Sequence, residues 1–177
     1  RELTQTGKTA AATTRKRIAV VGAGPAGLAC ATVAAQRGHE VVLFESDDRI
    51  GGQFNLARTI PGKEEFGETL RWFDWRIRET GVQLRLSTAA TPDALEGFDE
   101  IVLATGVRPS EVDFEGHAHP KVVGYLDVLR GSVVPGRRVA IVGAGGIGFD
   151  VAEFLVQPPP SPTLDVGQWM REWGVDP

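Results

Sequence analysis

Cysteine is nearly absent from this 177-residue sequence, in which Cys30 stands alone. A single cysteine excludes a disulfide bond within the chain, and it also excludes an iron–sulfur cluster held by four cysteines of this chain. Cys30 falls within a predicted helix, so we interpret it as a small buried thiol. The three histidines, His39, His117 and His119, lack the spacing of metal ligands, and the sequence predicts no metal site.

Long hydrophobic runs and an excess of positive charge are missing as well. No apolar run approaches the roughly 18 residues that a membrane-spanning helix needs, and the first 16 residues contain no apolar signal-peptide core. With 19 Lys and Arg against 23 Asp and Glu, the net charge is −4, and no basic face for nucleic acid is evident. We therefore expect a cytoplasmic protein that partners neither nucleic acid nor membrane.

Glycine is abundant, and its first cluster has an informative spacing. The apolar run Ile18–Val21 predicts a strand buried on both faces of a parallel sheet. It leads into Gly22, Gly24 and Gly27, the G-x-G-x-x-G spacing that permits a tight turn, a close approach to pyrophosphate and close packing of helix on strand. Pro25 suits the first turn of the helix that follows, where its missing N–H costs nothing.

A second predicted strand, Val41–Phe44, ends at Glu45, 23 residues after Gly22. A carboxylate there accepts hydrogen bonds from ribose hydroxyls and repels a 2′-phosphate, so the first site should prefer FAD or NAD over NADP. A glycine-rich packing turn beside a surface Glu45 is the alternative interpretation. The residues predicted to bind the dinucleotide in this region are Gly22, Gly24, Pro25, Ala26, Gly27, Glu45, Ser46, Arg49, Gly51, Gly52 and Gln53.

The stretch 63–80 predicts a helix, because apolar residues recur on one face from Phe66 to Ile77. Trp72 and Trp75 lie off this stripe. We expect them to join a wide core rather than to meet a missing domain.

A strand at 82–86 should follow, with Ala90 just beyond it, where a backbone group would meet an adenine edge. The strand Glu100–Leu103 then ends in Ala-Thr-Gly, a tripeptide that recurs near the cofactor in flavoproteins with two dinucleotide folds. A plain turn at the end of a strand is the alternative. The residues of this region predicted to bind the cofactor are Ala90, Ala104, Thr105 and Gly106.

The opening pattern repeats 121 residues later. Arg138–Val142 predicts a buried strand, and a helix over 149–156 follows a second glycine turn. Two such turns are far more specific than one, and they predict an FAD fold interrupted by an NAD(P)H fold. The residues of this turn predicted to bind NAD(P)H are Gly143, Gly145, Gly146 and Gly148.

Asp165 lies 22 residues after Gly143 and matches a ribose-binding acid by count. We reject it, because the proline run at Pro158, Pro159 and Pro160 forbids the strand that would present it.

The sequence therefore predicts an α/β chain: an incomplete, doubly wound Rossmann-like FAD-binding fold with helices on both faces of its sheet, plus the first βα unit of a second, NAD(P)-binding Rossmann-like fold. We expect a linker at 1–16, the FAD-binding portion at 17–131, the start of the NAD(P)H-binding domain at 132–157, and the beginning of a flexible insertion at 158–177. The second unit would expose apolar faces that absent partners cover.

Five segments carry a family resemblance: GAGPAGLA, RIGGQFNLARTIPGKEEFGETLRW, LATGVRP, HPKVVGYLDVLRG and AIVGAGGIGFDVAEFL. Together they resemble the C-terminal half of bacterial NADPH-dependent 2,4-dienoyl-CoA reductase, with trimethylamine and histamine dehydrogenase as more distant relatives. The resemblance covers nearly the whole chain from Arg17 onward.

This resemblance implies a large iron–sulfur flavoprotein, in which an N-terminal TIM barrel carries FMN, a 4Fe-4S cluster and the enoyl chemistry of fatty-acid β-oxidation. The C-terminal half binds FAD and takes hydride from NADPH, and electrons pass from FAD through the cluster to FMN. The FAD contacts that the resemblance implies are Gly22, Gly24, Ala26, Gly27, Glu45, Gly52, Gln53, Ala90 and Thr105. The pyridine-nucleotide contacts that it implies are Gly143, Gly145 and Gly148.

The chain also departs from the family pattern. No barrel and no cluster cysteines precede Arg1, so we expect the isolated chain not to reduce a dienoyl-CoA, and we predict no catalytic residue. Its partners, besides dinucleotide cofactors, should be the missing TIM-barrel and C-terminal segments. The strand whose end distinguishes NADH from NADPH is missing too.

Two functions stay open. The chain is either the electron-transferring portion of an FAD-dependent NAD(P)H oxidoreductase or an FAD- or ADP-binding module without turnover of its own. A thioredoxin-reductase-like enzyme is disfavoured, because the Cys-x-x-Cys pair of such enzymes is absent.

Overall fold

The structure is a computed structural model that describes residues 10–110, 113–157 and 160–176. The chain divides into two compact units. One contains the chain up to Phe54 together with Glu68–Val107, and the other contains Asn55–Gly67 and the chain from Arg108 onward. The first unit holds the predicted sheet and the first glycine turn, and the second holds the second glycine turn.

Four parallel strands form the sheet of the first unit, in the order β3-β2-β1-β4. They are β1 (Arg17–Val21), β2 (Glu40–Phe44), β3 (Gln83–Arg85) and β4 (Glu100–Leu103). In the central pair, Val20 lies beside Leu43, and both residues are fully buried. The arrangement confirms the predicted Rossmann-like α/β fold, because apolar runs of this kind suit strands that are covered on both faces.

The first helix, α1 (Pro25–Gln36), connects β1 to β2. Gly24 occupies its N-cap position and Pro25 its first turn. Just past its end, Gly38 adopts a φ of +94°, which glycine adopts without steric cost. Leu28 and Ala31 are fully buried against the strands, so α1 packs tightly on the sheet.

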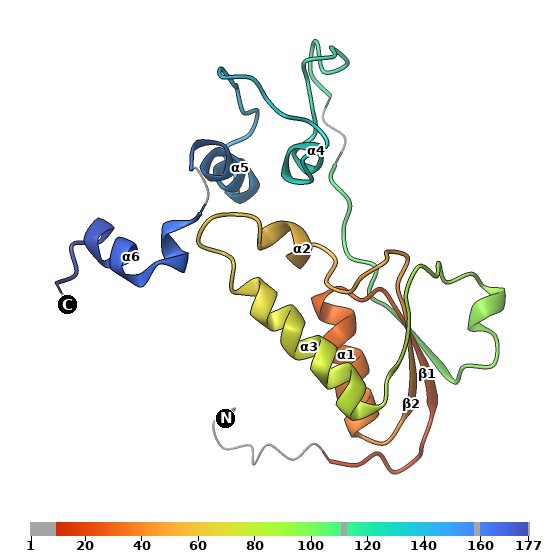
Figure 1. Ribbon diagram of the computed structural model, residues 1–177. Helices are drawn as coiled ribbons and strands as arrows, with labels where there is room; N and C mark the ends of the chain where they lie inside the picture. Colours follow the sequence, from red (N-terminus) through yellow and green to blue (C-terminus); the bar gives the residue numbers. More distant parts are fainter. Residues whose placement is uncertain (1–9, 111–112, 158–159, 177) are drawn as a thin grey trace. The chain divides into compact units, whose positions relative to one another are not determined.

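The helix α3 (Phe66–Thr80) confirms the predicted amphipathic helix. Leu70, Phe73 and Ile77 are buried in one cluster with residues of α1, β1 and β2. Both helices therefore cover the same face of the sheet (Figure 1).

The two tryptophans of α3 do not join the core, so that prediction is wrong. Trp72 and Trp75 keep 50% and 54% of their surface exposed. The guanidinium carbon of Arg76 lies 5.6 Å and 5.7 Å from their ring centroids, within the range of cation–π contacts. Because these residues lie off the buried stripe, their rings shield an arginine side chain and do not fill the core.

The opposite face of the sheet is covered by the segment between β3 and β4. Ala19, Val42 and Phe44 pack there, and the ring of Phe98 meets that of Phe44 edge-on at 6.1 Å. The covering segment contains the short 3-10 helix η2 (Asp93–Leu95). In the part of the chain that the structure describes, this face therefore carries a single helical turn and no α-helical layer, so the prediction of helices on both faces of the sheet is wrong.

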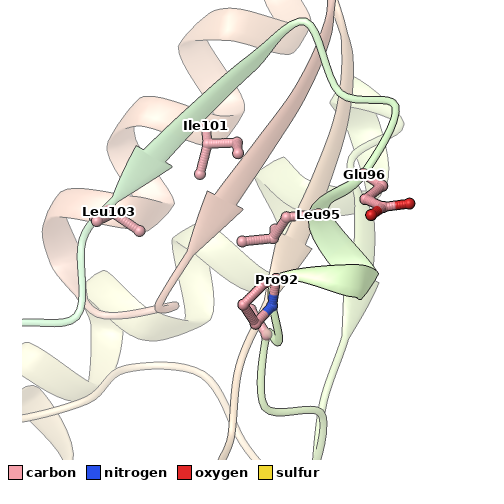
Figure 2. Close-up of a pocket in the computed structure, with 6 residues that line it drawn as sticks. Pro92, Leu95, Glu96, Ile101 and Leu103 are labelled. Atoms are coloured by element: carbon pink, nitrogen blue, oxygen red, sulfur yellow. The ribbon is translucent and has the colours of Figure 1, made fainter.

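The cover on this face stops short of β4. Ile101 and Leu103 are 48% and 72% exposed, and together with Pro92 and Leu95 they line an open apolar pocket (Figure 2). Strand β4 lies at the edge of the described sheet, so its side chains have fewer neighbours than those of the central strands.

The remaining helices are short. They are α2 (Phe54–Ala57), α4 (Tyr125–Leu129), α5 (Gly146–Val156), the 3-10 helix η3 (Pro162–Leu164) and α6 (Val166–Glu172). Val128 of α4 and Val151 of α5 are buried, and the two helices lie beside each other in the second unit.

The predicted strand Arg138–Val142 is wrong. These residues form no strand, and Val139, Ile141 and Val142 are 49%, 41% and 72% exposed. A strand needs a neighbouring strand to take its backbone hydrogen bonds, and no strand is found among the described residues of the second unit. The apolar pattern is present, but nothing pairs with it.

Asp165 caps the start of α6. Its Oδ1 accepts a hydrogen bond of 2.8 Å from the backbone N–H of Gln168, at the start of α6. Pro158 and Pro159 lie outside the described residues, as do residues 1–9 of the predicted linker. Residues 10–16 contain neither helix nor strand.

Two absences hold for the described residues. No helix among them is both long enough and apolar enough to cross a membrane. No group of three or more His, Cys, Asp or Glu side chains among them is placed to hold a metal ion.

The glycines of the first turn allow a matched test of the packing. A Cβ atom on Gly27 would lie 1.8 Å from the carbonyl oxygen of Gly22, whereas a Cβ atom on Gly24 would meet nothing within 4 Å. We expect Gly27→Ala to lower the free energy of unfolding by about 1–3 kcal/mol or more, because the backbone must shift. Gly24→Ala should lower it by no more than about 1 kcal/mol, the cost of alanine at the N-cap of α1.

Urea denaturation of both variants, followed by circular dichroism, measures the difference. Equal stability of the two variants would show that α1 does not pack on β1 as closely as described.

Candidate dinucleotide-binding site

The first glycine turn is pressed against the end of β4. Gly22 adopts a φ of +102°, and a Cβ atom on it would lie 2.4 Å from the carbonyl oxygen of Ala104 and 3.3 Å from the Cα of Thr105. The backbone N–H of Ala104 also donates to the carbonyl of Val21 at 2.8 Å. Two segments that are far apart in the sequence, the glycine turn and the Ala-Thr-Gly turn, are therefore in direct contact.

The three glycines of the turn have different surroundings. Gly22 and Gly27 are enclosed by backbone, so a side chain at either position would collide with it. Gly24 has open space where a side chain would be, and it immediately precedes the free N–H groups at the start of α1. The first turn of α1 contains no acidic residue. This end of the helix therefore suits an anion that approaches the backbone closely.

Glu45 follows β2 and is only 8% exposed. Its Oε2 accepts a hydrogen bond of 2.7 Å from the backbone N–H of Ala23, inside the glycine turn. Its Oε1 accepts bonds from the N–H of Asp47 at 3.0 Å and from the hydroxyl of Ser46 at 3.2 Å. These charge-assisted bonds hold the carboxylate beside the turn in one orientation.

The two glycines of the GGQ segment also lie against the first turn. The N–H of Gly51 donates to the carbonyl of Ala23 at 2.8 Å. A Cβ atom on Gly52 would lie 3.2 Å from the Cα of Gly24. Both glycines have positive φ values, +116° and +50°. The structure thus brings Gly51 and Gly52 to the turn, as their prediction as site residues requires.

Two polar side chains predicted for the site are engaged with other groups. The Nε2 of Gln53 donates to the carbonyl of Val107 at 3.1 Å, beyond the end of β4. Arg49 is exposed and pairs with Asp48, with 2.7 Å between Nε and Oδ1. The hydrogen bond and charge of Arg49 lower the pKa of Asp48 below its ordinary value.

Ala90 lies on the other side of the sheet. It is half-buried, packs against the cluster of Ala19, Val42 and Phe44, and lines the same apolar pocket as Pro92 and Leu95. The side chain of Ala90 therefore does not contact the glycine turn.

Sequence reasoning missed the backbone groups that organise the site. Ala23 donates its N–H to Glu45 and accepts at its carbonyl from Gly51. Ser87 has a φ of +49°, and the N–H groups of Ser87 and Thr88 donate to the carbonyls of Asp47 and Glu45, both at 2.8 Å. Main-chain groups carry no residue-type signal, so the only hint was the position of Ala23 between two glycines.

The second glycine turn repeats the internal geometry of the first. Gly143 has a φ of +112°, and a Cβ atom on Gly148 would lie 2.2 Å from the carbonyl oxygen of Gly143. Gly145 is the N-cap residue of α5, and a Cβ atom on Gly145 or on Gly146 would meet nothing within 4 Å. The first turn of α5 also lacks acidic residues.

In the first unit, strand β1 of the parallel sheet ends in the first glycine turn, and the carboxylate of Glu45 follows strand β2. This arrangement defines a Rossmann-like domain of the FAD- and NAD(P)-binding class. Comparison with known families gives the same class. Residues 16–158 match the family described as pyridine nucleotide-disulphide oxidoreductase, and the chain belongs to this family.

Three of the proteins that the chain is similar to are reductases. The chain is 36% identical to bilirubin reductase of Mediterraneibacter gnavus over 81% of its own length, and 38% identical to a metal reductase of Desulforamulus reducens over 84%. The solved structure of a 2-naphthoyl-CoA reductase complex superposes with a TM-score of 0.79, at 38% identity over 83% of the chain. The chain spans only 23% of the length of each of these three proteins. These similarities confirm the resemblance to dienoyl-CoA-reductase-like flavoproteins.

The role of the Glu45 carboxylate in the turn can be tested on the free protein. We expect Glu45→Ala to lower the free energy of unfolding by about 1–3 kcal/mol, because the buried N–H of Ala23 loses a charged acceptor. Glu40→Ala is the matched control: Glu40 begins the same strand, is 39% exposed at its side chain and pairs with Arg17 at 3.3 Å. Its removal should cost less than about 1 kcal/mol. Thermal and urea unfolding measure both, and an equal loss for the two variants would remove Glu45 from the organisation of the turn.

Proposed function

We propose that this chain is the electron-transferring portion of a larger reductase, in which it holds FAD at the first glycine turn and NAD(P)H at the second. One observation carries the proposal. The glycine turn, the buried carboxylate of Glu45 and the Ala-Thr-Gly turn after β4 meet at the carboxyl ends of adjacent parallel strands, which is where ligands bind in open α/β sheets.

The residues at this edge fit a dinucleotide. The open side of Gly24 and the first N–H groups of α1 suit the pyrophosphate, and the carboxylate of Glu45 suits ribose hydroxyls. FAD, when bound, supplies the two-electron carrier; the residues of the chain bind and orient it. The residues proposed to hold FAD are Gly22, Gly24, Pro25, Ala26, Gly27, Glu45, Ser46, Arg49, Gly51, Gly52, Gln53, Ala104, Thr105 and Gly106. Ala90 is proposed to contribute a backbone group at the adenine edge, since its side chain packs on the other face of the sheet.

The second turn is proposed to bind the hydride donor through Gly143, Gly145, Gly146 and Gly148. Its geometry matches that of the first turn, with the same close approach of its last glycine to the carbonyl of its first. On this proposal the FAD-binding portion extends over 17–131, and the NAD(P)H-binding domain starts at 132–157.

The whole protein is proposed to resemble a 2,4-dienoyl-CoA reductase. The chain covers only 23% of its relatives, and one solved relative is a 2-naphthoyl-CoA reductase in complex with 2-naphthoyl-CoA. We therefore propose a parent protein in which a TIM barrel with FMN and a 4Fe-4S cluster receives the electrons and reduces an unsaturated acyl-CoA. We also propose that the protein is cytoplasmic.

One observation favours a second function, that of an FAD- or ADP-binding module without turnover. The run before the second glycine turn, Arg138–Val142, forms no strand, so the second turn is not mounted on a sheet as the first one is. A turn without that support would bind a pyridine nucleotide weakly.

The absorption spectrum of the purified chain, before and after addition of FAD, distinguishes the two functions, with gel filtration to remove free flavin. Flavin absorbance that stays with the protein and bleaches on addition of NADPH supports the oxidoreductase. Flavin that stays but does not bleach, or retention of ADP alone, supports the binding module. Retention of neither would refute both.

The first site also makes a quantitative prediction. A hydrogen bond to a charged group contributes roughly 1.5–3 kcal/mol, so Glu45→Ala should weaken FAD binding about tenfold or more. Fluorescence titration of FAD under conditions where the variant is fully folded measures the affinity. Glu40→Ala, at the other end of β2, should bind FAD as the unmodified chain does. Unchanged affinity in Glu45→Ala would exclude the ribose role.

A further inference from the structure

The segment 55–67 belongs to the unit that does not contain its neighbours in the sequence. The chain leaves the first unit after Phe54, and it returns to that unit at Glu68, in the first turns of α3. Between these points the chain forms compact turns, in which Ile60 is 1% exposed. Two adjacent charged residues of this segment, Lys63 and Glu64, make specific contacts with other parts of the second unit.

Lys63 is the first of these residues. Its Nζ lies 2.6 Å and 2.7 Å from the two carboxylate oxygens of Asp150 in α5. The side chains are 38% and 30% exposed, so the pair is partly open to solvent. An ammonium that lies close to both oxygens of a carboxylate makes charge-assisted hydrogen bonds with it.

Glu64 is the second. Its Oε2 accepts a hydrogen bond of 2.9 Å from the hydroxyl of Thr163 in η3. Burial acts to raise the pKa of Glu64, but hydrogen bonds that include those from Ser161 and Thr163 outweigh it and hold the pKa below its ordinary value. The two adjacent residues therefore hold different parts of the second unit. Lys63 contacts α5, the helix of the second glycine turn, and Glu64 contacts the segment after that helix.

Helix α5 depends on such contacts because its usual support is missing. The run before it forms no strand, and the first residues of the turn are exposed. Helix α4 lies beside α5, with Val128 and Val151 buried. A charged contact at Asp150, the fifth residue of α5, therefore fixes the helix near the end that would face a ligand.

The charge of Asp150 matters as well as its position. A carboxylate in the second turn of a helix lies close to the positive end of the helix dipole and opposes the binding of an anion there. With Lys63 on both of its oxygens, that charge is offset.

We propose that Lys63 is a positioning residue for the second dinucleotide site: it fixes α5 through Asp150 and offsets the negative charge of Asp150, so that the turn Gly143–Gly148 can bind the pyrophosphate of a pyridine nucleotide. This inference rests on the proposed function for its ligand. The position of α5 itself does not, and the test separates the two.

Amide hydrogen exchange of the full 177-residue chain, without ligand, tests the positioning. We expect Lys63→Met and Asp150→Asn each to lower the protection of α5 amides about fivefold or more, and the double variant to lose no more than either single variant. Amides of β1 and β2 should exchange as in the unmodified chain. Lys121→Met is the control, since Lys121 forms no ion pair with any residue that the structure describes. Unchanged protection in Lys63→Met, or additive losses in the double variant, would overturn the proposal.

Titration with NADPH and with NADH tests the consequence for binding. Lys63→Met should weaken the nucleotide affinity about fivefold or more and leave the FAD affinity unchanged. The charge swap, Lys63→Asp with Asp150→Lys, keeps the combined reach of the two side chains and should recover most of the affinity. A swap that recovers nothing, with the chain folded, would contradict the role of the pair.

If the unmodified chain binds neither nucleotide, the NAD(P)H part of the proposed function fails for this chain. The hydrogen-exchange result then still decides whether Lys63 positions α5.

Discussion

The close approach of α1 to β1 is the constraint on which the first unit depends. The carbonyl oxygen of Gly22 occupies the space where a side chain on Gly27 would be, so helix and strand meet backbone to backbone. This contact places the first N–H groups of α1 at the edge of the sheet, and it leaves room for the Ala-Thr-Gly turn to lie on Gly22. Glu45 then holds the turn from the end of β2. Helix, turn and acid keep their relative positions because each contacts the backbone of another.

The second glycine turn shows which part of this arrangement needs a sheet and which part does not. Gly143 and Gly148 reproduce the close approach of the first turn, so this geometry is local and follows from glycine spacing alone. The strand before the turn does not form, because a strand exists only with a neighbour to share its hydrogen bonds. In its place, the side chains of Lys63 and Asp150 contact each other across the unit. The glycine turn can therefore form without a strand before it. The contacts that hold such a turn in place then come from another element.

The sequence predicted the elements of the first unit well because their signals are local. Strands β1, β2 and β4 follow apolar runs, and helices α1 and α3 end close before the glycines Gly38 and Gly81. Periodicity could not tell that Trp72 and Trp75 stay exposed, since a residue beside a buried stripe is covered only if another element lies there. For the site, the spacing of Gly22, Gly24, Gly27 and Glu45 predicted which residues meet. It could not predict that Gln53 and Arg49 turn to other partners.

By itself, the sequence determined the family, the parallel α/β fold and the positions of both glycine turns, since backbone conformation at glycine and burial of alternating or continuous apolar runs act within short stretches of chain. Only the tertiary structure decided which of two similar strand patterns became a strand, that Glu45 bonds to the N–H of Ala23, and that Lys63 reaches Asp150, 87 residues away in the sequence. The physical reason is the same in each case: these outcomes depend on backbone and charged groups supplied by distant parts of the chain, and such partners leave no trace in local residue patterns.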